Sequence, residues 1–157
     1  MEKLATFGAG CFWGLEALFA AQTGVIFTTV GYMGGHTLEV NYQAICQGDT
    51  GHAEVVQITF DDNQINYSQL LQLFWQNHNP TTPNQQGPDF GTQYRSAVFF
   101  HSQSQQELAL EMCQQMTEKQ VFKAPIVTLI EPAAFYHIAE EYHQQYLSKR
   151  GKTSCFF

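Results

Sequence analysis

The sequence is poor in positive charge. Its 157 residues include only 7 Lys and Arg against 14 Asp and Glu, which gives a formal net charge of −7. No Lys or Arg stands between Lys3 and Arg95. A nucleic-acid-binding surface needs clustered basic side chains, so we expect no nucleic-acid partner. An anionic substrate would also find no cation in this stretch, which favours a neutral one.

Long apolar runs are missing as well. No stretch of about 18 apolar residues is present to cross a membrane, and the N-terminus lacks the basic and apolar regions of a signal peptide. We therefore predict a soluble, cytoplasmic protein with no membrane partner. The chain is 44% hydrophobic and long enough for one packed domain over residues 1–157, which we expect to be a monomer.

Cysteine is sparse. The four cysteines (Cys11, Cys46, Cys113 and Cys155) form no CxxC pair and are too few for a disulfide scaffold. His52-Ala53-Glu54 matches the His-x-Glu half of the zinc deaminase signature, but the Pro-Cys-x-x-Cys half is absent. We expect no metal and no cofactor, so the question is which cysteine is reactive.

Cys11 stands in the motif Gly8-Ala9-Gly10-Cys11-Phe12-Trp13-Gly14. The apolar run 3–7 predicts a strand before the motif, and apolar spacing from Leu15 to Gln22 predicts a helix after it, with Gly24 just past the helix end. Cys11 is thus expected at a helix N-terminus, where backbone N–H groups favour a thiolate. Phe12 and Trp13 would then wall an apolar pocket. The alternative is a buried, inert cysteine.

The remaining elements follow from periodicity and turn residues. Strands are predicted over 25–30, 53–61, 96–101 and 126–130, helices over 68–77 (capped by Ser68) and 104–119 (capped by Ser104), and a broken helical region over 135–147. Residues 31–51 form a long glycine-punctuated loop. This order favours an α/β (α+β) two-layer sandwich with a ferredoxin-like split βαβ core, long functional loops and a mobile C-terminal tail over 148–157.

Glu54 is a candidate general acid. In the alternating strand 53–61 it shares a face with Val56, Ile58 and Phe60. A carboxyl group desolvated on that face shifts toward its protonated form and can donate a proton. The alternative is that Glu54 lies at the strand end and reaches solvent.

Loop residues supply further candidates. Tyr42 lies in the long loop, Asp89 follows a Pro- and Gly-rich stretch, and Tyr94 precedes the strand 96–101. Each could instead be a packing or loop-anchoring residue. Cys113 lies beside the apolar stripe of the helix 104–119, so we expect it to be inert and near the core.

Several motifs resemble the peptide methionine sulfoxide reductase A family. They are Gly-Cys-Phe-Trp-Gly with Glu16, then 30–35, Asn41-Tyr42, 48–54, 91–96 and 143–147, in the family's order over nearly the whole chain. The resemblance implies thiol-dependent reduction of methionine S-sulfoxide, peptide-bound and free, as repair of oxidative damage. It also implies thioredoxin as the reductant.

The resemblance assigns roles near the first motif. Cys11 would attack the sulfoxide sulfur, and Glu54 would protonate the departing oxygen. Phe12 and Trp13 would seat the S-methyl group.

The resemblance also assigns roles farther along the chain. Tyr42 and Tyr94 would hydrogen-bond the sulfoxide oxygen, and Asp89 would hold that oxygen site together. Cys155 would resolve the sulfenic acid on Cys11 as a disulfide. Cys46 is the alternative partner, because it lies in the same long loop as Tyr42.

Two other functional classes stay open at this point. A cysteine-dependent acyl transferase or amidase using Cys11 and Glu54 would need an activating base and an oxyanion hole, and no His is evidently paired with Cys11. A non-catalytic redox sensor would instead use a Cys11–Cys155 disulfide to change a partner interface.

Overall fold

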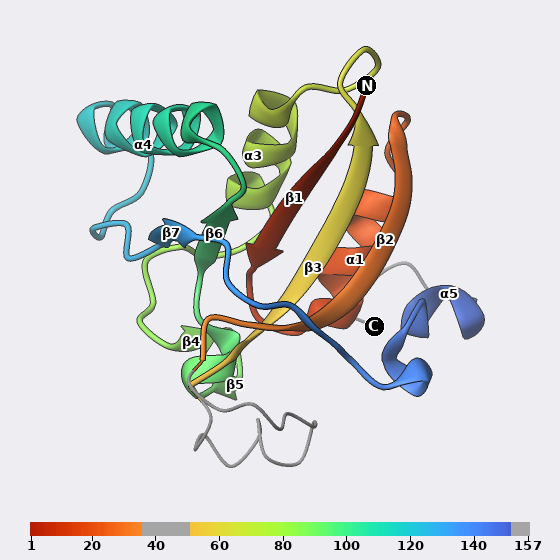
Figure 1. Cartoon of the computed structure of the whole chain (residues 1–157). Helices are drawn as coiled ribbons and strands as arrows, with labels where there is room; N and C mark the ends of the chain where they lie inside the picture. Colours follow the sequence, from red (N-terminus) through yellow and green to blue (C-terminus); the bar gives the residue numbers. More distant parts are fainter. Residues whose placement is uncertain (36–50, 152–157) are drawn as a thin grey trace.

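The computed structural model describes residues 1–35 and 51–151 and is built on a six-stranded sheet of order β7-β6-β1-β3-β2-β8 (Figure 1). The strands are β1 (Glu2–Gly8), β2 (Val25–Met33), β3 (Ala53–Asp61), β6 (Ala97–Phe100), β7 (Leu129–Pro132) and β8 (His137–Ile138). A separate two-stranded hairpin pairs β4 (Gln85–Gln86) with β5 (Asp89–Phe90).

The four inner strands follow a split βαβ plan. β3 pairs antiparallel with both β1 and β2, and β6 pairs antiparallel with β1. One helix follows β1 and another follows β3, which makes the β-α-β-β-α-β pattern of ferredoxin-like folds. β7 extends the sheet parallel to β6, and β8 extends it antiparallel to β2. The fold class predicted from the sequence is confirmed.

Three helices, α1 (Phe12–Ala20), α3 (Tyr67–Gln76) and α4 (Gln103–Glu118), lie on one side of the sheet (Figure 1). Their apolar side chains form the main core with β1, β3 and β6. Phe7 lies at its centre, with ring centroids 5.4 Å from Phe19 and 5.0 Å from Phe74. On the opposite face the segment after β7 crosses the sheet, where Ala133 and Tyr136 pack on a second cluster.

Two helix starts differ from the prediction. Asn66, not Ser68, caps α3: its side chain accepts from Gln69 N at 2.8 Å, and the Gln69 side chain accepts from Asn66 N at 2.9 Å. Ser102, not Ser104, caps α4 and accepts from Gln105 N. Both capping residues have the extended backbone that an N-cap requires, and the predicted residues are already helical.

Other element bounds also differ. α1 ends at Ala20 with Ala21 as its C-cap, so Gly24 does not follow the helix directly. Gly24, with φ +98°, instead forms the turn into β2, and its carbonyl accepts from Asp61 N. β2 runs on to Met33, beyond the predicted end at residue 30, and the last predicted strand, 126–130, is displaced to β7.

The predicted helical region 135–147 is wrong for most of its length. It contains β8, the 3-10 turn η2 (Glu141–His143) and only the start of α5 (Tyr146–Lys149). β8 pairs with Gly31 and Tyr32 of β2, and this edge pairing satisfies backbone groups that a helix would otherwise satisfy. Within residues 1–35 and 51–151, the helices are too short or too polar to cross a membrane.

Candidate active site

Cys11 is the N-cap residue of α1, at the point where the chain leaves β1 and turns into the helix. Its backbone is extended, with φ −61° and ψ 122°, and its side chain is half-buried. The first N–H groups of a helix point toward its N-cap and carry partial positive charge. No acidic side chain in the first turn of α1 opposes that charge.

Two glycines allow other segments to approach this turn. A Cβ at Gly8 would lie 3.1 Å from the carbonyl oxygen of Glu54 in β3. Gly10 has φ +83°, and a Cβ there would lie 2.7 Å from the side chain of Gln86 in β4. The absence of side chains at both positions therefore lets β3 and the β4–β5 hairpin pack directly against the turn that carries Cys11.

Glu54 is the second residue of β3 and is only 1% exposed. Its Oε1 accepts a hydrogen bond from the backbone N–H of Phe12, the first residue of α1, at 3.4 Å. The antiparallel register of β1 and β3, with Phe7 opposite Val56, brings the start of β3 beside the end of β1. The Glu54 carboxyl group therefore lies at the helix start capped by Cys11 and does not reach solvent.

The β4–β5 hairpin and the 3-10 turn η1 (Thr92–Tyr94) approach the same turn. Asp89 pairs with Gln86, whose side chain packs on Gly10. η1 packs against both β3 and β4, and it carries a half-buried Tyr94. Asp89 and Tyr94 thus come from segments gathered around Cys11, although they are distant from it in sequence.

Three of the candidate residues, Tyr42, Cys46 and Cys155, lie outside the described residues. Cys113 lies in α4, partly buried against the main core. Burial raises the pKa of the Cys113 thiol, with Thr117 acting in the opposite direction. The predicted position of Cys113 near the core is confirmed, and a raised pKa fits an inert thiol.

The two aromatic residues after Cys11 have different surroundings. Phe12 is buried, with its ring centroid 5.8 Å from that of Tyr32 and 5.1 Å from that of His143. Trp13 is partly exposed, donates its indole N–H to His143 Nδ1 at 3.0 Å, and stacks on Tyr146 with centroids 3.7 Å apart. Trp13 therefore presents apolar surface to solvent, and Phe12 lies behind it.

Glu16 links α1 to the C-terminal part of the described chain. Its buried carboxylate accepts from Thr28 Oγ1 at 2.9 Å, from Gln145 N at 2.8 Å and from Gln145 Nε2 at 2.9 Å. Burial raises the pKa of Glu16, and these hydrogen bonds act against the rise. The neighbouring residue Gln144 makes a second link to β2. Its side chain accepts a hydrogen bond from Val30 N and donates one to the Val30 carbonyl oxygen, each at 2.9 Å.

Sequence reasoning assigned no role to this linkage or to His143 and Tyr146. The available signal was that Glu16 and the run 143–147 belong to the quoted motifs. No local pattern pairs Glu16 with a residue 129 positions away.

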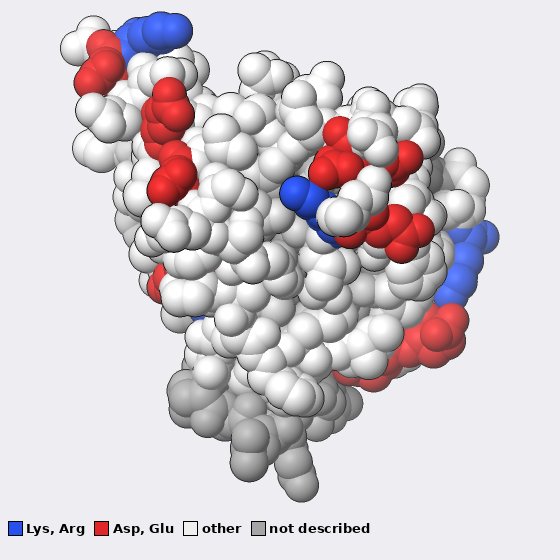
Figure 2. Space-filling model, turned by 45° about the horizontal axis from the view of Figure 1, so that its top comes forward, with Lys and Arg blue, Asp and Glu red and all other residues white. Residues whose placement is uncertain are grey.

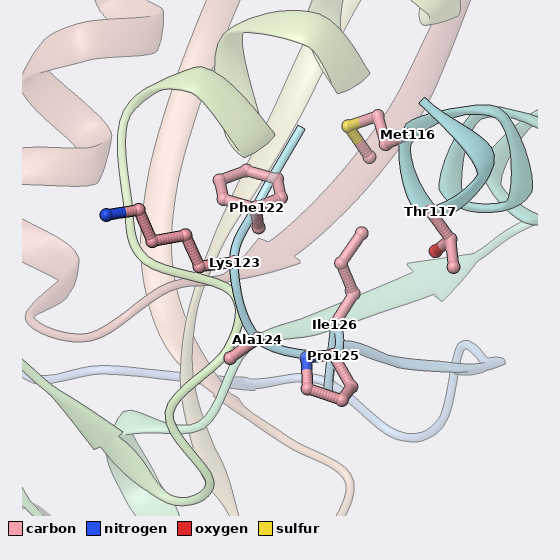
Figure 3. A pocket seen from close by; sticks show the side chains of 7 residues that line it. All are labelled: Met116, Thr117, Phe122, Lys123, Ala124, Pro125 and Ile126. Carbon is pink, nitrogen blue, oxygen red and sulfur yellow. The ribbon is translucent and has the colours of Figure 1, made fainter. Parts of the chain in front are cut away.

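Two cavities among the described residues are not lined by Cys11 or Glu54. Figure 2 shows acidic and basic side chains in a few separate groups, and most of the surface in that view carries neither. Cavities of about 200 and 440 Å³ lie beside α4 instead, the smaller lined by Met116, Phe122 and Ile126 among others (Figure 3). Their lining includes no cysteine or carboxylate. Among the residues that the structure describes, no three His, Cys, Asp or Glu side chains are grouped as metal ligands.

Comparisons with known proteins agree with the motifs. A sequence profile of the peptide methionine sulfoxide reductase family matches residues 3–157. The peptide methionine sulfoxide reductase MsrA of Methanothermobacter thermautotrophicus is 53% identical over 152 residues, which cover 97% of this chain and 90% of that protein.

Solved structures agree as well. Methionine sulfoxide reductase A of Corynebacterium diphtheriae superposes with a TM-score of 0.89 at 36% identity, covering 96% of this chain and 76% of that chain. Mxr1 of Saccharomyces cerevisiae in complex with Trx2 gives a TM-score of 0.64 at 25% identity, covering 92% and 84%.

Proposed function

Because the chain belongs to the peptide methionine sulfoxide reductase family of oxidoreductases, we propose that it reduces the S epimer of methionine sulfoxide, peptide-bound and free, with Cys11 as the nucleophile. The observation that carries this proposal is the contact between the buried Glu54 carboxyl group and the first N–H of the helix capped by Cys11. A nucleophile and a proton donor are thereby brought to one turn of the chain.

A sulfoxide is neutral, with an electrophilic sulfur and a weakly basic oxygen. The Cys11 thiolate attacks the sulfur while Glu54 gives a proton to the oxygen. The S–O bond of the substrate and the new bond between the two sulfurs then break as the oxygen passes to the Cys11 sulfur, so the products are methionine and a sulfenic acid on Cys11. The helix N-terminus supports the thiolate. Burial of Glu54 supports the neutral acid that this step needs.

The substrate's S-methyl group would lie against Trp13, with Phe12 forming the buried layer behind it. Tyr94 would hydrogen-bond the sulfoxide oxygen together with Tyr42, and Asp89 would support that oxygen site. The absence of Lys and Arg between Lys3 and Arg95 fits a neutral substrate. An acyl transferase or amidase has no comparable support, because the relatives that match are reductases.

The enzyme must then be re-reduced. A second thiol condenses with the sulfenic acid, which releases water and forms a disulfide. We assign this role to Cys155, with Cys46 as the alternative, and thioredoxin would reduce the disulfide by thiol exchange. Support for thioredoxin comes from the solved complex of the similar yeast Mxr1 with Trx2. We place the enzyme as a monomer in the reducing cytoplasm, which keeps the sparse cysteines available for catalysis.

One set of cysteine variants tests this proposal with separated sulfoxide epimers. Cys11→Ser should abolish reduction of the S epimer, and Cys113→Ser, the matched control, should retain the parent rate. Cys155→Ser should still release one equivalent of methionine per enzyme when substrate is first mixed. Its turnover with thioredoxin should collapse, because no disulfide forms for thioredoxin to attack.

Mass analysis after one turnover gives the outcome for each residue. We expect a Cys11–Cys155 disulfide in the parent and one added oxygen on Cys11 in Cys155→Ser. Substantial activity in Cys11→Ser would contradict the nucleophile, and preference for the R epimer would contradict the stereochemistry. A Cys11–Cys46 disulfide in the parent would move the resolving role to Cys46.

A further inference from the structure

Trp13 is held by two residues that follow one another closely near the end of the described chain. His143 Nδ1 accepts its indole N–H at 3.0 Å, and the Tyr146 ring stacks on it with planes only 6° apart. The Arg150 guanidinium lies 3.6 Å from the Tyr146 ring centroid. Since Trp13 and Arg150 both approach that ring so closely, they occupy opposite faces of it. The orientation of Trp13 is therefore fixed by groups outside α1.

The hydrogen bond from Trp13 dictates the tautomer of His143. An indole N–H can only donate, so Nδ1 must be the unprotonated nitrogen and the ring proton must sit on Nε2. Nε2 faces the Glu140 carboxylate at 3.5 Å. The Tyr142 hydroxyl donates to Glu140 Oε2 at 3.1 Å, which fixes the carboxylate in turn. Burial lowers the pKa of His143, with Glu140 opposing, so a neutral ring is favoured near pH 7.

His143 is 1% exposed, so its side chain acts on the site only through the groups that surround it. We propose that His143, with Nδ1 unprotonated and facing the Trp13 indole, is a positioning residue that orients Trp13 for the methyl side of the sulfoxide. The proposal rests on the proposed function, in which Trp13 seats that group. Without an acceptor at Nδ1, the indole would rotate to bring its N–H to water, and the apolar face offered to the substrate would change.

The backbone around His143 has its own anchors. Gln145 N bonds to Glu16, and the Gln144 side chain bonds to both backbone groups of Val30. A change at His143 therefore removes the acceptor for Trp13 and leaves these anchors in place. A substitution at His143 can therefore test its side chain without disturbing the hydrogen bonds of Gln144 and Gln145.

A pair of variants separates the acceptor from the ring. His143→Phe keeps an aromatic ring beside Phe12 and Trp13 but removes the acceptor. His143→Asn loses the ring but places an amide oxygen near the position of Nδ1. We expect KM for a sulfoxide substrate to rise about tenfold in His143→Phe with kcat nearly unchanged, as for one lost hydrogen bond. His143→Asn should restore KM to near the parent value.

Proton NMR of the indole N–H groups gives a second readout. The chain has two tryptophans, and Trp75 donates its indole N–H to Thr128 Oγ1 at 3.0 Å, so its signal serves as an internal reference. In His143→Phe the Trp13 signal should move toward the position of a weaker hydrogen bond, while the Trp75 signal stays in place. In His143→Asn the Trp13 signal should remain close to that of the parent.

A double-mutant cycle completes the experiment. In a Trp13→Phe background there is no indole N–H to orient, so His143→Phe should add no further change in KM. If His143→Phe does not fold, His143→Gln serves as the acceptor-removing variant, because its longer amide reaches the Nε2 position.

Three results would overturn the proposal: an unchanged KM and Trp13 signal on loss of the acceptor, no rescue by folded His143→Asn, or an additive cycle. If the parent enzyme does not reduce sulfoxides, the proposed function fails, and the NMR signals still report whether His143 orients Trp13.

Discussion

Burial and a backbone hydrogen bond act in opposite directions on the charge of Glu54. Its burial, with 1% exposure, disfavours a negative charge, whereas the hydrogen bond from Phe12 N stabilises one. In the proposed reaction, substrate bound at Cys11 would displace water from this turn and strengthen the effect of burial. The proposed role of Glu54 as general acid requires that burial prevail in the enzyme–substrate complex.

Replacing Glu54 tests this role at the chemical step. Glu54→Ala should lower the single-turnover rate of methionine formation by roughly 10²–10⁴, the usual range for loss of a general acid. Glu54→Gln should lose less, because its amide can still donate a hydrogen bond to the oxygen. Glu107→Ala, on the exposed side of α4, is the control. Rapid-quench rates equal to the parent for both Glu54 variants would exclude the acid role.

At the scale of elements, the decisive contact joins α1 and β2 to residues 144–145. The buried Glu16 carboxylate accepts three hydrogen bonds, from Thr28 and from the backbone and side chain of Gln145. Gln145 adopts a left-handed backbone with φ +53°, which is uncommon in a non-glycine residue, and its hydrogen bonds to Glu16 hold it in place. This contact brings His143 and Tyr146 to Trp13.

Glu16→Ala should destabilise the protein measurably. Removing the carboxylate leaves the buried Thr28 hydroxyl and the Gln145 backbone N–H without their acceptor, while Gln145 Nε2 keeps only the Thr28 carbonyl, and this costs about 2–3 kcal/mol. For a chain of this length the melting temperature should fall by roughly 5–10 °C. Glu118→Ala at the end of α4 is the matched control, since that carboxylate is exposed and accepts a hydrogen bond from the exposed Gln114 side chain. An unchanged melting temperature in Glu16→Ala would show that the linkage contributes little.

At the scale of the whole molecule, a partly buried polar network ties the end of α3 to the starts of β6 and β7 at one edge of the sheet. His78 bonds the Phe74 carbonyl through Nδ1 and Ser96 Oγ through Nε2, the latter at 2.8 Å. Ser96 Oγ lies 2.7 Å from Thr128 Oγ1, which accepts the indole N–H of Trp75. Burial lowers the pKa of His78 to about 4, so the ring is neutral in the folded protein at pH 7.

This partly buried histidine should make stability depend on pH. Between about pH 6.5 and pH 4 the unfolded chain binds a proton at His78 that the folded protein does not, so this contribution is complete above pH 6.5 and is lost as the pH falls. Allowing for partial exposure of the ring, the loss should be about 2 kcal/mol. Urea unfolding at pH 7 and pH 4.5 should show a smaller pH effect in His78→Phe than in the parent. Equal pH effects would contradict a neutral, buried His78.

The sequence by itself determined features that depend on neighbours in the chain. The glycines and apolar spacing around Cys11 predicted a strand, a turn and a helix start, and these are present. Alternation along 53–61 predicted a strand with Glu54 on the face of Val56 and Ile58, and both of these belong to the main core. Element order was enough for the split βαβ plan. Periodicity and turn chemistry act over a few residues, so a sequence shows them directly.

Only the tertiary structure decided which distant groups meet. The caps at Asn66 and Ser102 were missed because several nearby polar side chains could cap each helix, and packing of the helix selects its first turn. The region 135–147 was predicted as helical, yet pairing with β2 makes part of it a strand. Trp13 and His143 are 130 positions apart in the sequence. They meet because the hydrogen bond between Glu16 and Gln145 holds their two segments together. Such contacts depend on three-dimensional packing and leave no periodic trace in the sequence.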